Sequence, residues 1–297
     1  MNAPAPQIDV VVRFHNIRRL AELERCISSL VMQTYRPLRI ILTLQRFSHN
    51  DVLAVTEALA PLLEMDNPPI LSVLNWNEPE PADGRSVLLN LGVEAADGRY
   101  IAFLDYDDVL YPEAYELLIA RLRRTGAAIA FARVRTMELD VNPRFLYPRK
   151  TVRPTYTGNS LADLFRRNFC PLHSYVIDRS QLPPGLLQFE PSITIEEDYE
   201  ALLRICATVS SDFGLAQIGV TVGDYNFKRD GSNTVPAGGA AAIEGETAVV
   251  YRYAKAAIEE RRRTTLIMKP VERLLGLPET RRPRSVRQAL DELPPSA

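Results

Sequence analysis

Short apolar runs alternate with segments of helical periodicity along the first half of the chain. The apolar runs, each of a length typical of strands, cover 8–12, 38–44, 69–75, 100–104 and 127–134. The segments between them place apolar residues three and four positions apart, over 20–32, 50–64, 86–97 and 112–126. This strict alternation predicts an α/β fold with a mostly parallel, Rossmann-like sheet and helices on both faces. Ligands of such sheets bind beyond the carboxyl ends of the strands.

The pattern is less regular after residue 151. It predicts a helix over 159–168, a strand over 174–179, an amphipathic helix after 195 and a late strand within 216–227. A Pro-, Gly- and Ala-rich linker follows at 236–242, and one long helix is expected over 243–263, before a tail rich in Pro and Arg. We therefore expect one α/β domain over 1–235 and a helical, basic C-terminal extension over 236–297.

The composition is that of an ordinary globular protein, with 46% hydrophobic and 24% charged residues among 297. No apolar run approaches the roughly 18 residues that span a membrane, and the opening MNAPAPQ lacks the features of a signal peptide. Three distant cysteines in no metal or redox spacing are expected to be buried free thiols in a reducing cytoplasm. Residues 250–297 hold 11 Lys and Arg against 6 Asp and Glu, which suggests peripheral contact with the inner face of a membrane. The alternatives are a solvated helix with a disordered end, and a dimer contact.

Three carboxylates, Asp105, Asp107 and Asp108, directly follow the predicted strand at 100–104. Neighbouring carboxylates push one another toward protonation, and a cation between them would keep them charged. The bland alternative is a solvated turn that caps the next helix, because negative charge is favourable before a helix N-terminus. Three acids at the carboxyl end of a strand exceed what capping needs, so we expect a ligand site there.

Four separate segments resemble family 2 glycosyltransferases in order and spacing. They are VVVRFHN with LERCISSLVMQTYRPLRIIL, GRSVLLNLGVEAADGRYIAFLDYDDVLYPEA, IEEDYEALLRI and DYNFKRDGSNT, within 8–234. The resemblance implies a GT-A fold. It also implies an inverting enzyme that moves a sugar from a nucleotide-sugar donor to a glycan or lipid-linked glycan acceptor, with no nucleic-acid partner.

The resemblance also implies roles for the carboxylates. Asp107 would hold Mn²⁺ or Mg²⁺ together with the donor diphosphate, since these ions prefer oxygen ligands, and Asp105 would reach the ribose or the ion. Asp198 matches the position of the base that takes the acceptor proton. Glu197 is expected to orient Asp198 or to bind a sugar hydroxyl, and His173 is expected at the donor sugar or the acceptor. An acidic first turn and a structural histidine are the alternatives for the last three residues.

The remaining candidates would bind the donor. They are Arg13, Phe14, Asn16, Gln45, Asp105, Tyr106, Lys228 and Arg229. Gln45 and Arg46 replace an acidic pair common in relatives, and Arg13 replaces a proline, so UDP, dTDP and GDP donors all stay open. Plain surface charge is the alternative for Lys228 and Arg229, and packing is the alternative for Tyr106.

Two other functions remain open at this stage. A catalytically inactive nucleotide-sugar-binding module would keep the cleft without the transfer. FLDYDDVL also resembles the Asp-x-Asp of haloacid-dehalogenase-type phosphatases, in which the first Asp is a nucleophile.

Overall fold

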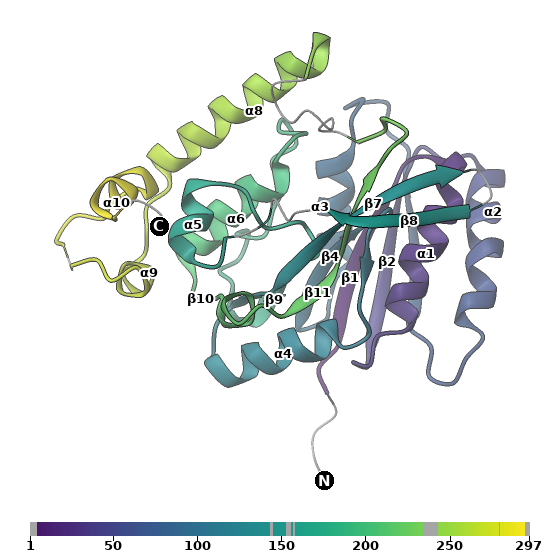
Figure 1. Ribbon diagram of the computed structural model, residues 1–297, viewed down its shortest axis with the longest axis horizontal. Coiled ribbons are helices and arrows are strands. Elements are labelled where there is room, and N and C mark those ends of the chain that lie inside the picture. Colours follow the sequence, from purple (N-terminus) through teal and green to yellow (C-terminus); the bar gives the residue numbers. More distant parts are fainter. Residues whose placement is uncertain are drawn as a thin grey trace.

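The computed structural model describes residues 5–142, 145–152, 156, 158–233, 243–278 and 280–294. Its centre is a seven-stranded sheet with the order β10-β6-β9-β4-β1-β2-β3 (Figure 1). The strands are β1 (Ile8–Phe14), β2 (Leu38–Gln45), β3 (Ile70–Trp76), β4 (Tyr100–Asp105), β6 (Ile129–Phe131), β9 (Tyr175–Asp178) and β10 (Ser211–Asp212). β1 is parallel to β2 and β4, β2 is parallel to β3, and β9 is antiparallel to both β4 and β6. The predicted mostly parallel sheet is confirmed.

Helices lie on both faces of this sheet. Those of the first half are α1 (Leu20–Val31), α2 (His49–Leu59), α3 (Arg85–Ala95) and α4 (Ala114–Thr125). The 3₁₀ turn η1 (Ile17–Arg19) precedes α1, and η2 (Ala60–Leu63) follows α2. α2 begins at a capping box between Ser48 and Asp51, and α4 ends at Gly126, whose φ of 69° suits glycine.

The alternation of side chains along β1 builds two cores. Val10 and Val12 face the cluster that includes α1, α2 and α4, whereas Val11 faces the cluster on the α3 and α6 side. All three side chains are completely buried. A strand covered on both faces is continuously apolar, which explains the run VVV.

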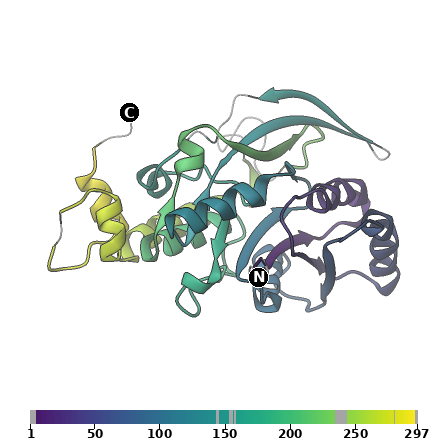
Figure 2. The same ribbon diagram turned by 90° about the horizontal axis from the view of Figure 1, so that it is seen from below.

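A second sheet of four strands crosses the end of the first. Its order is β5-β11-β7-β8, with β5 (Val109–Leu110), β7 (Arg133–Asn142), β8 (Phe145–Val152) and β11 (Thr221–Lys228). β7 and β8 form a long hairpin that extends over α1 (Figure 2). The sequence pattern did not predict β8, because FLYPRKTV contains Pro and two cations. This sheet matters for function because β5 follows the acidic residues after β4 and pairs with β11, which ends at Lys228. The pairing brings these two segments side by side.

The C-terminal region is folded against the rest of the chain. It contains α8 (Gly245–Thr264), α9 (Lys269–Leu274) and α10 (Val286–Glu292), which lie beside α5 (Leu161–Arg166) and α6 (Glu197–Thr208) in Figure 1. The short elements η3 (Arg179–Gln181) and α7 (Gly214–Gln217) complete the fold. Val271, Val286 and Ala289 are buried in the same core as α6.

Arginines of this region form internal contacts rather than one free basic surface. Arg262 donates to the Tyr199 hydroxyl at 2.7 Å, and Arg261 pairs with Glu200 at 2.5 Å. Arg284 is almost buried between Glu272 and Glu292, each 2.8 Å away. The basic tail therefore pairs many of its charges within the chain. The expected linker at 236–242 and the expected domain boundary at 235/236 lie outside the described residues, and the two-part division stays a prediction.

The structure also shows the state of the cysteines and the character of the helices. Cys26, Cys170 and Cys206 are buried free thiols, as expected. Among the helices that the structure describes, none has the length and apolar character needed to cross a bilayer.

The closest approach between α3 and the sheet yields a stability prediction. A Cβ at Gly92 would lie 2.3 Å from Cγ1 of Val11, so Gly92→Ala must push α3 away from β1. We expect a loss of about 1–3 kcal/mol in the free energy of unfolding, measured by urea titration. Glu94→Ala, on the exposed side of the same helix, should change it by less than about 0.5 kcal/mol. Equal stability of the two variants would contradict this packing.

Candidate active site

A cavity of about 600 Å³ opens at the carboxyl ends of β1, β2 and β4, where the alternating pattern predicted a ligand site. Its polar and charged lining comes from five separate parts of the chain. The charged side chains are Arg13, Arg19, Asp83, Arg85, Asp105, Asp107 and Lys228. Positive and negative groups therefore share one space, which suits a ligand that carries phosphate and a cation together.

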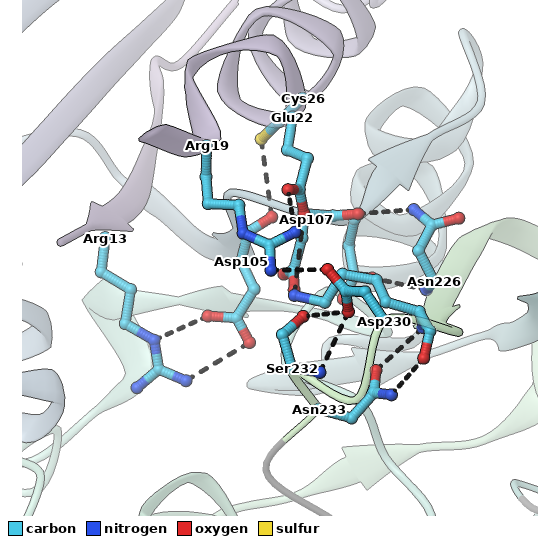
Figure 3. A network of polar contacts seen from close by, with 12 residues as sticks. Arg13, Arg19, Glu22, Cys26, Asp105, Asp107, Asn226, Asp230, Ser232 and Asn233 are labelled. Atoms are coloured by element: carbon cyan, nitrogen blue, oxygen red, sulfur yellow. Dashed lines mark hydrogen bonds and ion pairs between the residues drawn. The ribbon is translucent and has the colours of Figure 1, made fainter. Parts of the chain in front are cut away.

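Arg13 at the end of β1 connects the two acidic motifs. Its Nε lies 2.6 Å from Oδ1 of Asp105 on β4, and its other arm lies 2.5 Å from Oε1 of Glu197 on α6. Burial alone would raise the pKa of Asp105, but the charge and hydrogen bonds of Arg13 outweigh it and lower that pKa. Burial likewise opposes the charge of Arg13, whose pKa is nevertheless raised by Asp105 and Glu197. Arg13 thus keeps a carboxylate ionised at the cavity wall (Figure 3).

Asp107 forms an ion pair with Lys228 at the wall of the cavity. The Lys228 Nζ lies 2.7 Å from Oδ2 of Asp107 and 3.7 Å from Oε2 of Glu22 on α1. Asn226 on β11 donates to the backbone carbonyl of Asp107 at 2.6 Å and so fixes the turn after β4 (Figure 3). Burial would lower the pKa of Lys228, but the charge of Asp107 and its neighbours raises it. Residues 226–233, here called the closing segment, are therefore held to the acidic turn at 105–108 by this ion pair and hydrogen bond.

Asp108 points away from the cavity into the protein. It is buried, accepts a hydrogen bond from the backbone N–H of Asn226 at 2.7 Å, and lies 3.3 Å from Nδ1 of His173. Burial and the neighbouring Asp107 and Asp105 raise its pKa well above the ordinary value. Burial lowers the pKa of His173 to about 4. A neutral acid beside a neutral imidazole is consistent with both shifts, and this pair supports the turn from behind.

Asp198 stands in the first turn of α6, next to Glu197. It is partly exposed, and its Oδ1 accepts a hydrogen bond from the backbone N–H of Tyr199 at 2.8 Å. Burial, followed by the nearby Glu197, raises its pKa to about 8. A carboxylate with a pKa near neutrality can take up and release a proton under working conditions.

The structure brings most of the predicted residues together. Asn16, Gln45, Tyr106 and Lys228 line the cavity with Arg13, Asp105 and Asp107. The Gln45 amide donates to the Ala82 carbonyl at 2.8 Å and accepts from the backbone N–H of Gly84 at 3.3 Å. It therefore shapes the wall of the cavity.

Four predicted contacts need correction. Phe14 is completely buried and packs 5.1 Å from the Tyr106 ring, so it supports the wall from behind and cannot touch a donor. Arg229 does not line the cavity and pairs instead with Glu138 at 3.2 Å on β7. His173 and Glu197 are 1% and 3% exposed, which leaves neither open to a sugar or an acceptor. His173 lies beside the Asp108 carboxylate, and Glu197 is paired with Arg13.

Several residues of the site were not anticipated from the sequence. Arg85 begins α3 and pairs with Asp83, and Arg19 ends η1 and bridges Glu22 and Asp230 at 2.8 and 2.6 Å. Ser232 and Asn233 on the closing segment also line the cavity. The available signal was local: each arginine stands where a loop enters a helix at the carboxyl end of a strand.

The carboxylates suit a divalent ion that is shared with phosphate. Within the described residues, no three His, Cys, Asp or Glu side chains form a cluster that could hold a metal. Asp105 and Asp107 nevertheless line the same cavity, and Mg²⁺ is commonly held by one or two carboxylates together with substrate phosphates and water. The donor set therefore fits an ion that arrives with an anionic ligand.

The Arg13 bridge yields the next prediction. Arg13→Met should cost roughly 3 kcal/mol of unfolding free energy at pH 8, because it leaves partly buried carboxylates without their cation. Without Arg13, burial raises the pKa of Asp105, so its ionisation destabilises the fold at high pH and is relieved by protonation at low pH. The loss should therefore shrink between pH 8 and pH 4 in urea titrations.

The matched control for this experiment is Arg18→Met, five residues away on an exposed position. It should change the unfolding free energy by less than about 0.5 kcal/mol at either pH. A loss in Arg13→Met that is the same at pH 4 and pH 8 would show that charge compensation is not its role.

Comparison with known proteins places the chain in a family. The sequence model of glycosyl transferase family 2 matches residues 9–179. The chain is 31% identical over 113 residues to the uncharacterized glycosyltransferase YibD of Escherichia coli (strain K12), which is 38% of this chain and 29% of that protein. It is 29% identical over 126 residues to the succinoglycan biosynthesis protein ExoO of Rhizobium meliloti (strain 1021), 40% of this chain and 36% of that protein. These matches span about a third of each relative's length.

Solved structures share the fold at low sequence identity. The crystal structure of S. aureus TarS 1–349 gives a TM-score of 0.54 at 13% identity, over 74% of this chain and 60% of that one. The same protein in complex with UDP gives 0.58 at 11% identity, over 91% and 69%. The GT-A fold is confirmed by this likeness, and the phosphatase alternative does not agree with the family match. The match covers more than half of the sequence, and the chain therefore belongs to glycosyl transferase family 2.

Proposed function

We propose that this chain transfers a sugar, with inversion, from a nucleotide-sugar donor to a glycan or lipid-linked glycan acceptor in a metal-dependent reaction. The supporting observation is the Arg13 bridge, which joins the carboxylate at the end of β4 to the first turn of α6. Because the bridge ties the end of β4 to the first turn of α6, the proposed diphosphate site and the proposed base would share one frame. A transfer reaction needs both, because a leaving group departs while a hydroxyl loses its proton.

The donor is proposed to be a UDP-sugar. The TarS structures of the same fold were solved with UDP and with UDP-GlcNAc. The cavity of about 600 Å³ lies within the roughly 300–1,000 Å³ range of small-molecule sites. Tyr106 borders this cavity with its ring, and Asn16 borders it with an amide.

Asp107 is proposed to hold Mn²⁺ or Mg²⁺, with Asp105 beside it. The ion would supply positive charge at the departing diphosphate. Arg19, Arg85 and Lys228 supply further positive charge from the walls of the cavity. Together they stabilise the leaving group, which is the charge that develops in the transition state.

Asp198 is proposed as the base that takes the proton of the acceptor hydroxyl. Glu197 is committed to Arg13, which fixes the first turn of α6 and the position of Asp198. The acceptor would approach from the α6 side. Exposed arginines of the C-terminal helices, such as Arg263, would contact an anionic membrane that carries a lipid-linked acceptor.

The donor assignment can be tested with a thermal-shift panel of UDP-, dTDP- and GDP-sugars, each with and without Mn²⁺. We expect one UDP-sugar to raise the melting temperature selectively, because a ligand that binds the folded state stabilises it by mass action. Asp107→Asn should remove the Mn²⁺-dependent part of the shift. A shift of the same size with Mn²⁺ and with chelator would contradict the metal assignment.

The base assignment predicts both a variant and a pH profile. Asp198→Asn should lower the transfer rate by about 10²–10⁴-fold, since an amide cannot take the proton. The raised pKa of about 8 means that Asp198 is largely protonated at pH 7, so kcat/KM should fall tenfold per pH unit below about 8.

Donor binding separates this role from a structural one. UDP affinity of Asp198→Asn, measured by calorimetry, should stay within about threefold of the wild-type value. Wild-type transfer rates in the variant, or a kcat/KM that is flat from pH 5 to pH 8, would disprove the assignment. Selective donor binding without transfer to any acceptor would favour the inactive nucleotide-sugar-binding module.

A further inference from the structure

Lys228 forms an ion pair with Asp107, the carboxylate proposed to bind the divalent ion. Its Nζ is 2.7 Å from Oδ2 of Asp107, 3.7 Å from Oε2 of Glu22 and 5.6 Å from the centre of the Tyr106 ring. The side chain is only 4% exposed, so the ammonium group sits among these partners rather than in solvent. Glu22 Oε2 has no hydrogen-bond partner, and the Lys228 ammonium lies nearest to it, while Arg19 binds Oε1 of the same carboxylate at 2.8 Å.

An ammonium group and a divalent ion cannot share this position. Both are cations, and their mutual repulsion is strong at the short distance that a shared carboxylate imposes. Asp107 is 21% exposed toward the cavity, but its Oδ2 is already bound. Lys228 must leave Asp107 before that oxygen can coordinate an ion.

Hydrogen bonds hold the backbone around Lys228, so a change of partner by its ammonium group requires only side-chain rotation. Lys228 is the last residue of β11, and its N–H donates to the side-chain oxygen of Asn233 at 2.9 Å. The Asn233 amide donates back to the Lys228 carbonyl at 2.5 Å, and Asp230 is held by Arg19 at 2.6 Å (Figure 3). Movement of Lys228 is therefore a rotation of its four-carbon side chain.

The other cavity cations are committed elsewhere. Arg13 is shared by Asp105 and Glu197, Arg85 pairs with Asp83, and Arg19 is held by two carboxylates. A donor diphosphate is the partner that gives a displaced ammonium group new negative charge within the same cavity. A metal ion alone offers no such compensation.

We infer that Lys228 is a resident cation that closes Asp107 to divalent ions until a nucleotide diphosphate enters, so that the ion and the nucleotide bind cooperatively. This inference rests on the proposed function, because it takes Asp107 as the carboxylate that holds the ion. It adds an order of events: the diphosphate draws Lys228 away, and Asp107 becomes available to the ion. By thermodynamic linkage, the ion must strengthen nucleotide binding by the same factor.

The test is a Mn²⁺ titration followed by electron paramagnetic resonance of the free ion, with and without UDP, which needs no transferase activity. For the wild-type chain we expect weak Mn²⁺ binding alone and binding at least about tenfold tighter with UDP. Lys228→Met should bind Mn²⁺ about tenfold more tightly without UDP and should gain less from UDP. Lys228→Arg, which keeps the charge, should behave like the wild-type chain.

Arg85→Met is the matched control, because it removes another cavity cation that does not contact Asp107. A gain in Mn²⁺ affinity as large as that of Lys228→Met would reduce the effect to net charge and overturn the inference. Equal Mn²⁺ affinity of the wild-type chain and Lys228→Met would also overturn it. So would the absence of Mn²⁺ binding to either chain with UDP present, which would mean that Lys228 replaces the ion.

A second neutral variant guards against misfolding. Lys228→Gln keeps a hydrogen-bond donor for Asp107 and should show the same gain in Mn²⁺ affinity as Lys228→Met. Failure of the proposed function appears differently, as absent UDP binding in the wild-type chain or as unchanged Mn²⁺ affinity in Asp107→Asn. If this inference alone fails, the wild-type chain still binds UDP and Asp107→Asn still loses Mn²⁺ affinity.

Discussion

The ion pairs of Arg13 are the interaction on which the site depends. Asp105 and Glu197 lie 92 and 184 residues from Arg13 in the sequence, and one guanidinium group binds both side chains. A planar guanidinium with five donors suits this task, whereas the single ammonium of lysine would bind one carboxylate well. The bridge connects β1, β4 and α6 at the carboxyl ends of the two strands. It also keeps a partly buried carboxylate charged in a region where burial favours the neutral form.

The sequence pattern predicted the sheet, its direction and the place of the acidic cluster, because these follow from local periodicity. The end of β4 at Asp105 and the end of α4 at Gly126 were both visible in that way. The pattern did not predict β8, since a Pro and two cations hide its strand character. The contacts of Arg13 and Lys228 with distant carboxylates lay beyond any local signal.

The corrected residues share a cause. Phe14 lies in the opening segment that resembles the family, yet the alternation along β1 directs its side chain into the core. His173 and Glu197 are polar residues in a site region, yet each is used for an internal partner. A motif identifies which segments come together, but the direction of each side chain depends on the packing around it.

Charge balance describes the cavity as a whole. Each cation among its described lining residues is paired with at least one carboxylate, so the free site avoids the cost of buried unpaired charge. An anionic ligand competes with these internal carboxylates for the same cations. Affinity for such a ligand is then a difference between two sets of ion pairs, which favours discrimination over tight binding.

Two arginines of α8 have a consequence for shortened forms of the chain. Arg261 and Arg262 grip Glu200 and Tyr199, the two residues that follow Asp198. A shortened chain that lacks this helix would lose both anchors, so a minimal catalytic fragment cannot simply end after the closing segment. The same two contacts connect α8 directly to the first turn of α6, which carries Asp198.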